Sequence, residues 1–143
     1  MVKALIGMVW LGILSVWDIR HRAVPVILLR IGLVLAGGSS LWEWGAGEKN
    51  LFGLFLGVIP GVCMLLVAMF THQAGCADGI VLLTLGLVYG YRANMLLLCG
   101  SLMLLSICAL VLLCLKKVHK DTRLPFLPFV SVMYALQIWG RLL

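Results

Sequence analysis

The feature that most constrains the fold is a series of long apolar runs, interrupted only by short polar segments. A helix that crosses the hydrocarbon core of a bilayer needs about 20 apolar residues. The runs predict spans over residues 2–17, 24–42, 51–70, 79–91, 94–115 and 125–143. Hydrophobic residues make up 64% of the chain, against about half in soluble domains, and a soluble fold of 143 residues could not bury so much apolar surface. We therefore expect an all-α polytopic membrane protein, one domain over residues 1–143 with about six transmembrane helices in one bundle.

The charge pattern sorts the connecting segments by side. The formal net charge is +6, but the basic residues lie in short clusters between apolar runs, which favours the positive-inside bias over a nucleic-acid partner. Six basic residues follow the first and fifth spans, namely Arg20, Arg22, Lys116, Lys117, Lys120 and Arg123. The opposite side holds four, namely Lys3, Lys49, Arg92 and Arg141. This bias places the segments after the first, third and fifth spans in the cytoplasm, with the lipid bilayer as the surrounding partner.

Two of the aspartates are predicted to end on the same side of the membrane. Asp18 follows the first span and Asp78 follows the third, so two crossings separate them whichever way the chain is oriented. The third aspartate, Asp121, belongs to a charged segment and reads as solvated. The fourth predicted span has 13 residues, about 20 Å of helix against about 30 Å of hydrocarbon. Asp78 therefore lies below the cytoplasmic surface, or the fourth segment is re-entrant, or it forms a helical hairpin with the fifth.

A pair of carboxyls below the membrane surface suggests a specific chemistry. Burying a carboxylate there is costly, so chains tolerate it where it is paired or used. Two carboxyls brought close together share one proton. The ionised partner then serves as a general base toward water, and the protonated partner polarises a scissile carbonyl. The alternative is that Asp18 pairs with Arg20 or Arg22 and that Asp78 merely caps its helix, and position alone does not decide between the two.

Three motifs resemble those of type IV prepilin peptidases, and they occur in that family's order. Residues 18–25 (DIRHRAVP) resemble its D-x-R-x-x-x-(I/V)-P segment, residues 75–78 (GCAD) its G-x-G-D motif, and residues 125–129 (PFLPF) its proline-aromatic motif. The resemblance implies a GxGD-type membrane aspartyl peptidase with Asp18 and Asp78 as the catalytic pair. It also implies an active site at the cytoplasmic face of the inner membrane that removes the basic leader of a prepilin-like, single-helix precursor. The supporting or substrate-binding positions would be Arg20, Pro25, Gly75, Ala77, Gly79 and Arg30.

Departures from the family pattern keep two other functions open. Ala77 replaces the second glycine of G-x-G-D, Ile80 stands where many members carry lysine, and Val26 replaces a frequent asparagine. The paired C-x-x-C motifs of larger members are absent from the sequence, which fits a short, peptidase-only form. A catalytically silent relative that serves pilus or secretion assembly is the first alternative, and a small ion-coupled transporter is the second. No metal or other cofactor is expected, because the histidines have no ligand partners at useful spacing.

Three features inside the spans carry further expectations. Arg30 lies about two turns into the second span, where we expect it to snorkel to the headgroups, although it could instead face an aspartate. Gly57 and Gly61 form a G-x-x-x-G pair, expected to serve internal helix packing rather than dimerisation. Pro60, between them, is expected to kink that helix.

Overall fold

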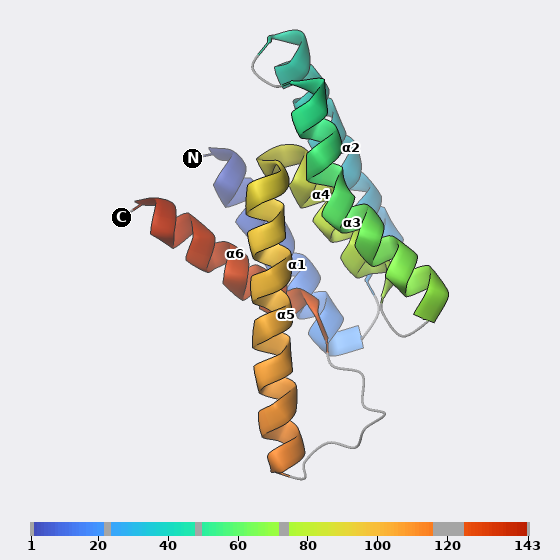
Figure 1. Ribbon diagram of the computed structural model, residues 1–143, viewed down its shortest axis with the longest axis vertical. Helices are drawn as coiled ribbons and strands as arrows, with labels where there is room; N and C mark the ends of the chain where they lie inside the picture. The colour runs from blue at the N-terminus through green and yellow to red at the C-terminus, as the bar shows by residue number, and fades with distance from the viewer. Residues whose placement is uncertain (1, 22–23, 48–49, 72–74, 116–124, 143) are drawn as a thin grey trace. The chain divides into compact units, whose positions relative to one another are not determined.

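The computed structural model describes residues 2–21, 24–47, 50–71, 75–115 and 125–142 (Figure 1), and within these ranges every regular element is an α-helix. The helices are α1 (Val2–His21), α2 (Val26–Gly45), α3 (Leu51–Thr71), α4 (Cys76–Tyr89), α5 (Tyr91–Cys114) and α6 (Leu127–Leu142). By length and composition, α1, α2, α3 and α5 are long and apolar enough to cross a membrane, whereas α4 and α6 are shorter apolar helices. The prediction of an all-helical chain is thus confirmed, and four of its helices have the character of membrane spans.

Several predicted boundaries differ from the observed helix ends by two to four residues, and two of these differences concern the aspartates. Helix α1 continues beyond Trp17 to His21, and α4 begins at Cys76 rather than at residue 79. Helix α6 begins at Leu127 rather than at residue 125. Hydropathy marks where apolar side chains end, but backbone hydrogen bonding continues through polar residues. Both Asp18 and Asp78 therefore lie inside helices and not in the segments between them.

The chain divides into two compact units, each of which is described by itself. The first consists of Met1–Ala23 and Cys99–Leu143, and the second is Val24–Leu98. In the first unit α1 packs against α6. Buried side chains follow one face of each helix, namely Leu11 and Leu14 on α1 and Leu127, Val130 and Tyr134 on α6. The Tyr134 hydroxyl donates a hydrogen bond of 3.2 Å to the Ala4 carbonyl oxygen near the start of α1.

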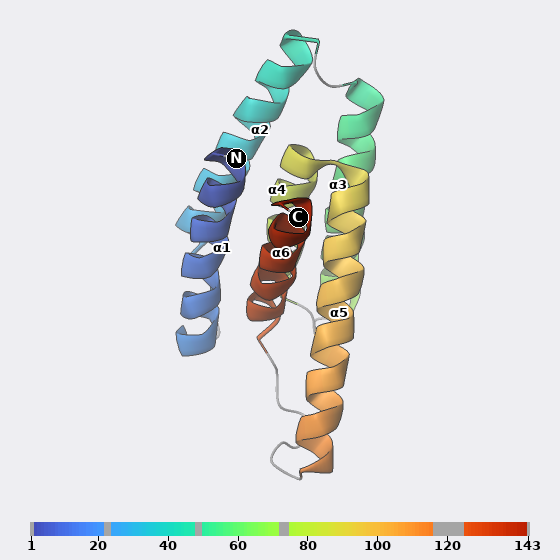
Figure 2. The ribbon, with the colours of Figure 1, turned by 90° about the vertical axis from the view of Figure 1, so that its left-hand side faces the viewer.

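In the second unit α4 lies between α2 and α3 (Figures 1 and 2), and glycines bring α3 and α4 close together. A Cβ atom on Gly61 would lie 2.5 Å from the Cα atom of Leu83, and one on Gly79 would lie 2.6 Å from Cγ of Leu65. A Cβ atom on Gly57 would strike the Gly86 carbonyl. The contacts pair early α3 with late α4, so the two helices are antiparallel. The prediction that Gly57 and Gly61 serve internal packing is confirmed, and α3 continues as one helix through Pro60.

Small residues also line the contact between α2 and α4. Gly32, Ala36 and Ser40 recur at intervals of four on α2, and all three are buried. The Ser40 hydroxyl donates a hydrogen bond of 2.8 Å to the Leu87 carbonyl oxygen. Leu87 lies in the last turn of α4, where carbonyl groups have no partner within the helix. The Ser40 side chain on α2 thus supplies a hydrogen-bond donor to the Leu87 carbonyl group near the end of α4.

Helices α4 and α5 form a hairpin joined by a single residue. Gly90 has φ 79° and ψ −179°. The side-chain amide nitrogen of Asn94 (Nδ2) donates hydrogen bonds of 2.9 Å to the carbonyl oxygens of Gly57 and Leu82. A straight helix would separate Leu82 from Asn94 by about 18 Å, so the chain must reverse its direction at Gly90, and the first turn of α5 lies against α4. Among the arrangements that the sequence allowed for the short fourth segment, the hairpin is the one that these contacts support.

The turn at Gly90 predicts a measurable effect. Gly90→Ala is expected to lower the free energy of unfolding by about 1–3 kcal/mol, because this φ and ψ combination is essentially restricted to glycine. A steric clash is not the cause of this loss of stability, since nothing lies within 4 Å of the added Cβ atom. Gly53→Ala in α3 is the matched control, because its Cβ atom also meets open space and its φ is not positive. Unfolding in detergent micelles measures both, and equal stability of the two variants would contradict the argument.

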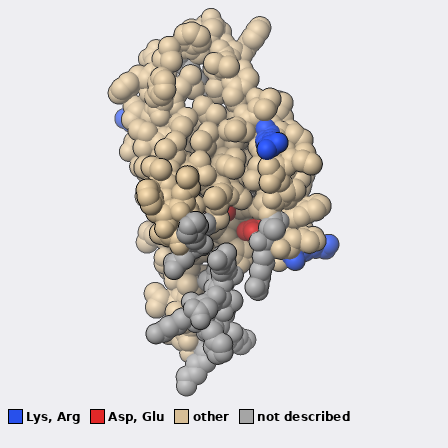
Figure 3. Space-filling model, turned by 90° about the vertical axis from the view of Figure 1, so that its right-hand side faces the viewer, with Lys and Arg blue, Asp and Glu red and all other residues tan. Residues whose placement is uncertain are grey.

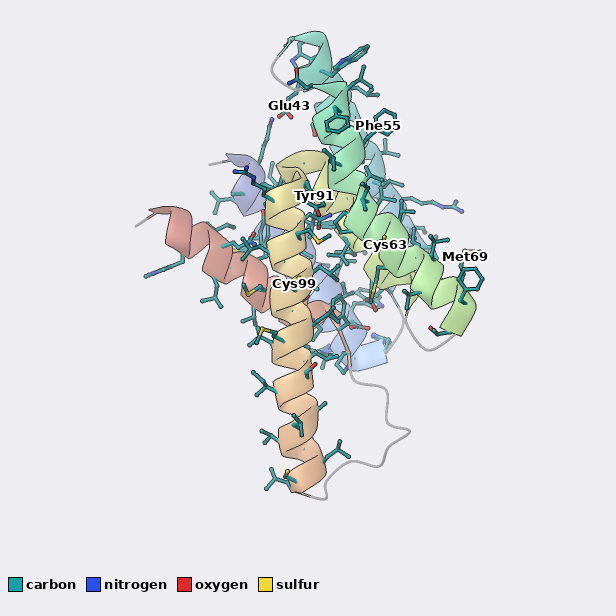
Figure 4. All side chains as sticks on the ribbon, viewed as in Figure 1. Glu43, Phe55, Cys63, Met69, Tyr91 and Cys99 are labelled. Atoms are coloured by element: carbon teal, nitrogen blue, oxygen red, sulfur yellow. The ribbon has the colours of Figure 1, made fainter. Side chains whose placement is uncertain are left out.

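Many large apolar side chains are exposed on the outer surface, which is unfavourable in water. Phe70 is 83% exposed and Trp42 is 80% exposed, and both carry large apolar side chains. Phe55 and Met69 point away from α3 (Figure 4), at 69% and 64% exposure. The face drawn in Figure 3 shows few charged atoms among the residues described. Exposed apolar area of this extent indicates contact with lipid or with other proteins.

Candidate functional site

Asp18 lies in the last turn of α1, on the face that packs into the first unit. It follows Leu14 by four positions and Leu11 by seven, so the three side chains share one face of the helix. Both leucines are fully buried, and Asp18 is half-buried. The same periodicity that builds the contact with α6 therefore turns the carboxylate inward.

The partner of the Asp18 carboxylate is a backbone group at the start of α6. The Leu127 amide donates a hydrogen bond to it. Burial and the C-terminal end of its own helix both disfavour the charged carboxylate, and the Leu127 amide at the N-terminus of α6 offsets part of that cost. Asp18 thus acts as a cap on α6, supplied by α1.

The alternative pairing of Asp18 with Arg20 does not agree with the helix geometry. Residues two positions apart point in different directions on a helix. Asp18 is half-buried, whereas Arg20 is exposed. The other proposed partner, Arg22, lies outside the described residues.

Asp78 is the third residue of α4, so it does not occupy the position just before the helix that the capping alternative assumed. Gly75 holds the N-cap position with φ −76° and ψ 128°, and its carbonyl oxygen accepts a hydrogen bond of 3.1 Å from the Asp78 amide. The half-buried Asp78 side chain turns back toward Gly75, because a Cβ atom on Gly75 would lie 3.1 Å from Oδ2. The first turn of a helix is a favourable place for a negative charge.

The residues around Asp78 fit the helix without strain. Ala77 is the second residue of α4, and the positive-φ glycines among the described residues are Gly47 and Gly90. Alanine in place of the motif's second glycine therefore costs no backbone strain at this position. Gly79 is buried against Leu65, so its role is to let α3 approach α4 at the turn that carries Asp78.

Gly75 is the position where an added methyl group would act on the carboxylate itself. Gly75→Ala places a Cβ atom 3.1 Å from Oδ2 of Asp78, closer than an ordinary contact, so the carboxylate must shift by a few tenths of an ångström. If Asp78 is catalytic, peptide cleavage should fall roughly tenfold, since small misplacements of reacting groups are costly. Gly12→Ala in α1 is the control, because its Cβ atom meets open space. Equal cleavage rates in the two variants would show that the Asp78 position does not matter.

Two further predicted supporting residues have structural roles in α2. Pro25 is the N-cap residue, with φ −65° and ψ 123°, and its carbonyl oxygen accepts hydrogen bonds from Leu28 at 3.1 Å and Leu29 at 3.4 Å. Proline suits a helix start because it has no amide hydrogen to satisfy. Arg30 is exposed on α2, as snorkelling requires, and its exposure gives no support to an inward role beside a carboxylate.

The two aspartates belong to different units, and each has its own surroundings. Asp18 lies beside the start of α6, and Asp78 lies near Gly75 on a helix whose next residue, Gly79, meets Leu65 of α3. Sequence reasoning missed the Leu127 amide and the buried side chain of Asn94. The spacing of Leu11, Leu14 and Asp18 was a signal for the first, and a lone amide in an apolar span was a signal for the second.

Within the described ranges, no three His, Cys, Asp or Glu side chains are grouped so that they could hold a metal ion. His72, His119 and Asp121 lie outside those ranges.

Comparison of the chain with protein-family models, with curated proteins and with solved structures finds no match in any of the three.

Proposed function

We propose that the chain is a membrane-embedded aspartyl endopeptidase that removes the basic leader of prepilin-like, single-helix precursors at the cytoplasmic face of the inner membrane. In this proposal Asp18 and Asp78 are the catalytic pair, and α4 and α6 complete a bundle of six transmembrane helices. The observation that carries the proposal is that both carboxylates are half-buried in a scaffold of apolar helices, each within one turn of a helix end. Carboxylates in such surroundings are costly unless they are paired, hydrogen-bonded or used.

Chain topology supports placing both carboxylates on one side of the membrane. Helices α1, α2 and α3 are each long enough to cross a bilayer once. Asp18 is near the end of α1, and Asp78 follows the end of α3, so two complete crossings separate them. If each of these helices crosses once, the two carboxylates reach the same face, as a shared active site requires.

The shortness of α4 supports access of water to Asp78. Its 14 residues extend about 21 Å, less than the roughly 30 Å of hydrocarbon. If the Gly90 turn lies near the outer interface, the first turn of α4 lies below the cytoplasmic surface. Asp78 would then sit in a shallow recess that water can enter.

The proposed reaction uses one proton shared between the two carboxyls. The ionised carboxylate removes a proton from a water molecule, whose oxygen attacks the scissile carbonyl carbon, while the protonated partner donates a hydrogen bond to the carbonyl oxygen. The tetrahedral intermediate then collapses, the C–N bond breaks, and the departing nitrogen takes a proton from a carboxyl. The substrate must be locally unwound, because helical hydrogen bonding shields its carbonyl group from attack.

The experiment that tests the function is co-expression with a precursor that has a short basic leader and one apolar helix. Mass spectrometry of the recovered precursor is expected to show loss of the leader when the wild-type chain is present and an intact leader when it is absent. An intact, membrane-inserted precursor in both cases would contradict the proposal and favour the silent relative to which Ala77 and Ile80 point. Ion-dependent flux into vesicles without any cleavage would instead favour a transporter.

A further inference from the structure

The start of α6 offers one backbone donor to the Asp18 carboxylate. The Phe126 carbonyl oxygen accepts hydrogen bonds from the amides of Phe129 at 3.0 Å and Val130 at 3.3 Å. Pro128 has no amide hydrogen to give. Of the first amides of α6, that of Leu127 therefore remains for Asp18, and it makes this bond.

The residue that donates this bond is buried. Leu127 is fully buried, and so is Val130 one turn further along the same face of α6. Hydrogen bonds to a charged group contribute more than those between neutral groups, and more again where water is excluded. The Leu127 amide is therefore able to fix the orientation of the carboxylate rather than merely to contact it.

A second polar contact holds the two helices together at the opposite end of α1. The Tyr134 hydroxyl bonds to the Ala4 carbonyl oxygen, whereas Leu127 bonds to Asp18, fourteen positions later on α1. Leu11 and Leu14 fill the space on α1 between these two contacts. The α1–α6 pair is thus joined at two separated points, so the direction from which the Leu127 amide meets Asp18 is set by helix packing.

We propose that the backbone amide of Leu127 is a positioning group for the catalytic carboxylate of Asp18, fixing which of its oxygens faces the reacting water. One carboxylate oxygen is held by the amide and the other is left to act as the base. This inference rests on the proposed function. It adds that α6, through its first amide, is part of the catalytic apparatus and not only of the scaffold.

The test removes the amide hydrogen and keeps the rest of the helix. Leu127→Pro does this at the first position of a helix, where proline is well tolerated. Leu127→Val is the matched control, since its side chain is similar in size to that of proline and it keeps the amide hydrogen. In purified protein with a precursor peptide, Leu127→Pro is expected to lower kcat at least tenfold relative to Leu127→Val, with KM changed less than about threefold. The pH profile of kcat should also shift in the proline variant alone.

A second variant serves if proline prevents folding. Replacing Leu127 by its α-hydroxy analogue converts the amide into an ester, which removes the hydrogen without changing the side chain. The infrared band of the Asp18 carboxyl, assigned by its loss in Asp18→Asn, should move in the ester variant and remain in place in Leu127→Val. Equal kcat values and pH profiles, with an unmoved band, would overturn the inference. A moved band in a chain that cleaves nothing in its wild-type form would instead reject the proposed function and retain the hydrogen bond as a purely structural cap.

Discussion

Asp18→Asn and Asp78→Asn are each expected to lower leader cleavage by about a thousandfold or more while the protein remains folded. General acid–base groups contribute about 10²–10⁴-fold each, and removing one carboxyl leaves the other without its proton partner. Asparagine at position 18 keeps an oxygen that can accept the hydrogen bond from the Leu127 amide. Loss of activity without loss of folding is therefore the expected result at this position, measured by mass spectrometry of the precursor and by unfolding in detergent.

Two further variants show whether the loss is specific. Glu43→Gln changes the remaining carboxylate of the described residues, in the last turns of α2, and is expected to leave cleavage within about twofold. Asp18→Ala should be as inactive as Asp18→Asn, but less stable by about 1 kcal/mol, because the start of α6 loses its cap. Full precursor processing by either asparagine variant would end the protease proposal.

The helical fold was predictable because apolar runs of this length specify long apolar helices. The apolar runs gave the number and order of the helices, and the G-x-x-x-G pair gave the close face of α3. The helix ends were predicted less well. Helix α1, for example, continues through Asp18 to His21, because backbone hydrogen bonding does not stop where the apolar side chains end. The hairpin between α4 and α5 rests on one glycine with positive φ, which the sequence alone does not distinguish from other glycines.

The candidate site was predictable in its side chains but not in its backbone partners. Asp18 and Asp78 stand out because carboxylates are rare and costly in apolar segments. The Leu127 amide could not be identified in this way, because every residue except proline carries the same group. Its position depends on the contact between α1 and α6, which are distant in sequence and brought together by packing. The structural reason for Gly79 likewise became visible only with Leu65 of α3 placed against it.

Gly86→Ala and Gly61→Ala are expected to cost the largest amount of stability in the chain, about 3 kcal/mol or more each. Overpacking normally costs about 1–3 kcal/mol, and here the added atom meets backbone, which cannot rotate away. On Gly86 it would strike the Gly57 carbonyl and lie 2.5 Å from the Asn94 amide nitrogen. On Gly61 it would lie 2.5 Å from both the backbone nitrogen and the Cα atom of Leu83.

The same two variants are expected to lose cleavage activity together with stability, because the α3–α4 contact sets the position of the helix whose first turn carries Asp78. Gly38→Ala in α2 is the matched control: nothing lies within 4 Å of its added Cβ atom, so it should unfold at or slightly above the wild-type denaturant concentration. Unfolding of all three variants in mixed micelles, beside their cleavage rates, separates the two effects. If Gly61→Ala and Gly86→Ala matched Gly38→Ala in stability, α3 and α4 could not be in the contact that these glycines allow. The placement of the first turn of α4 against α3 would then have to be abandoned.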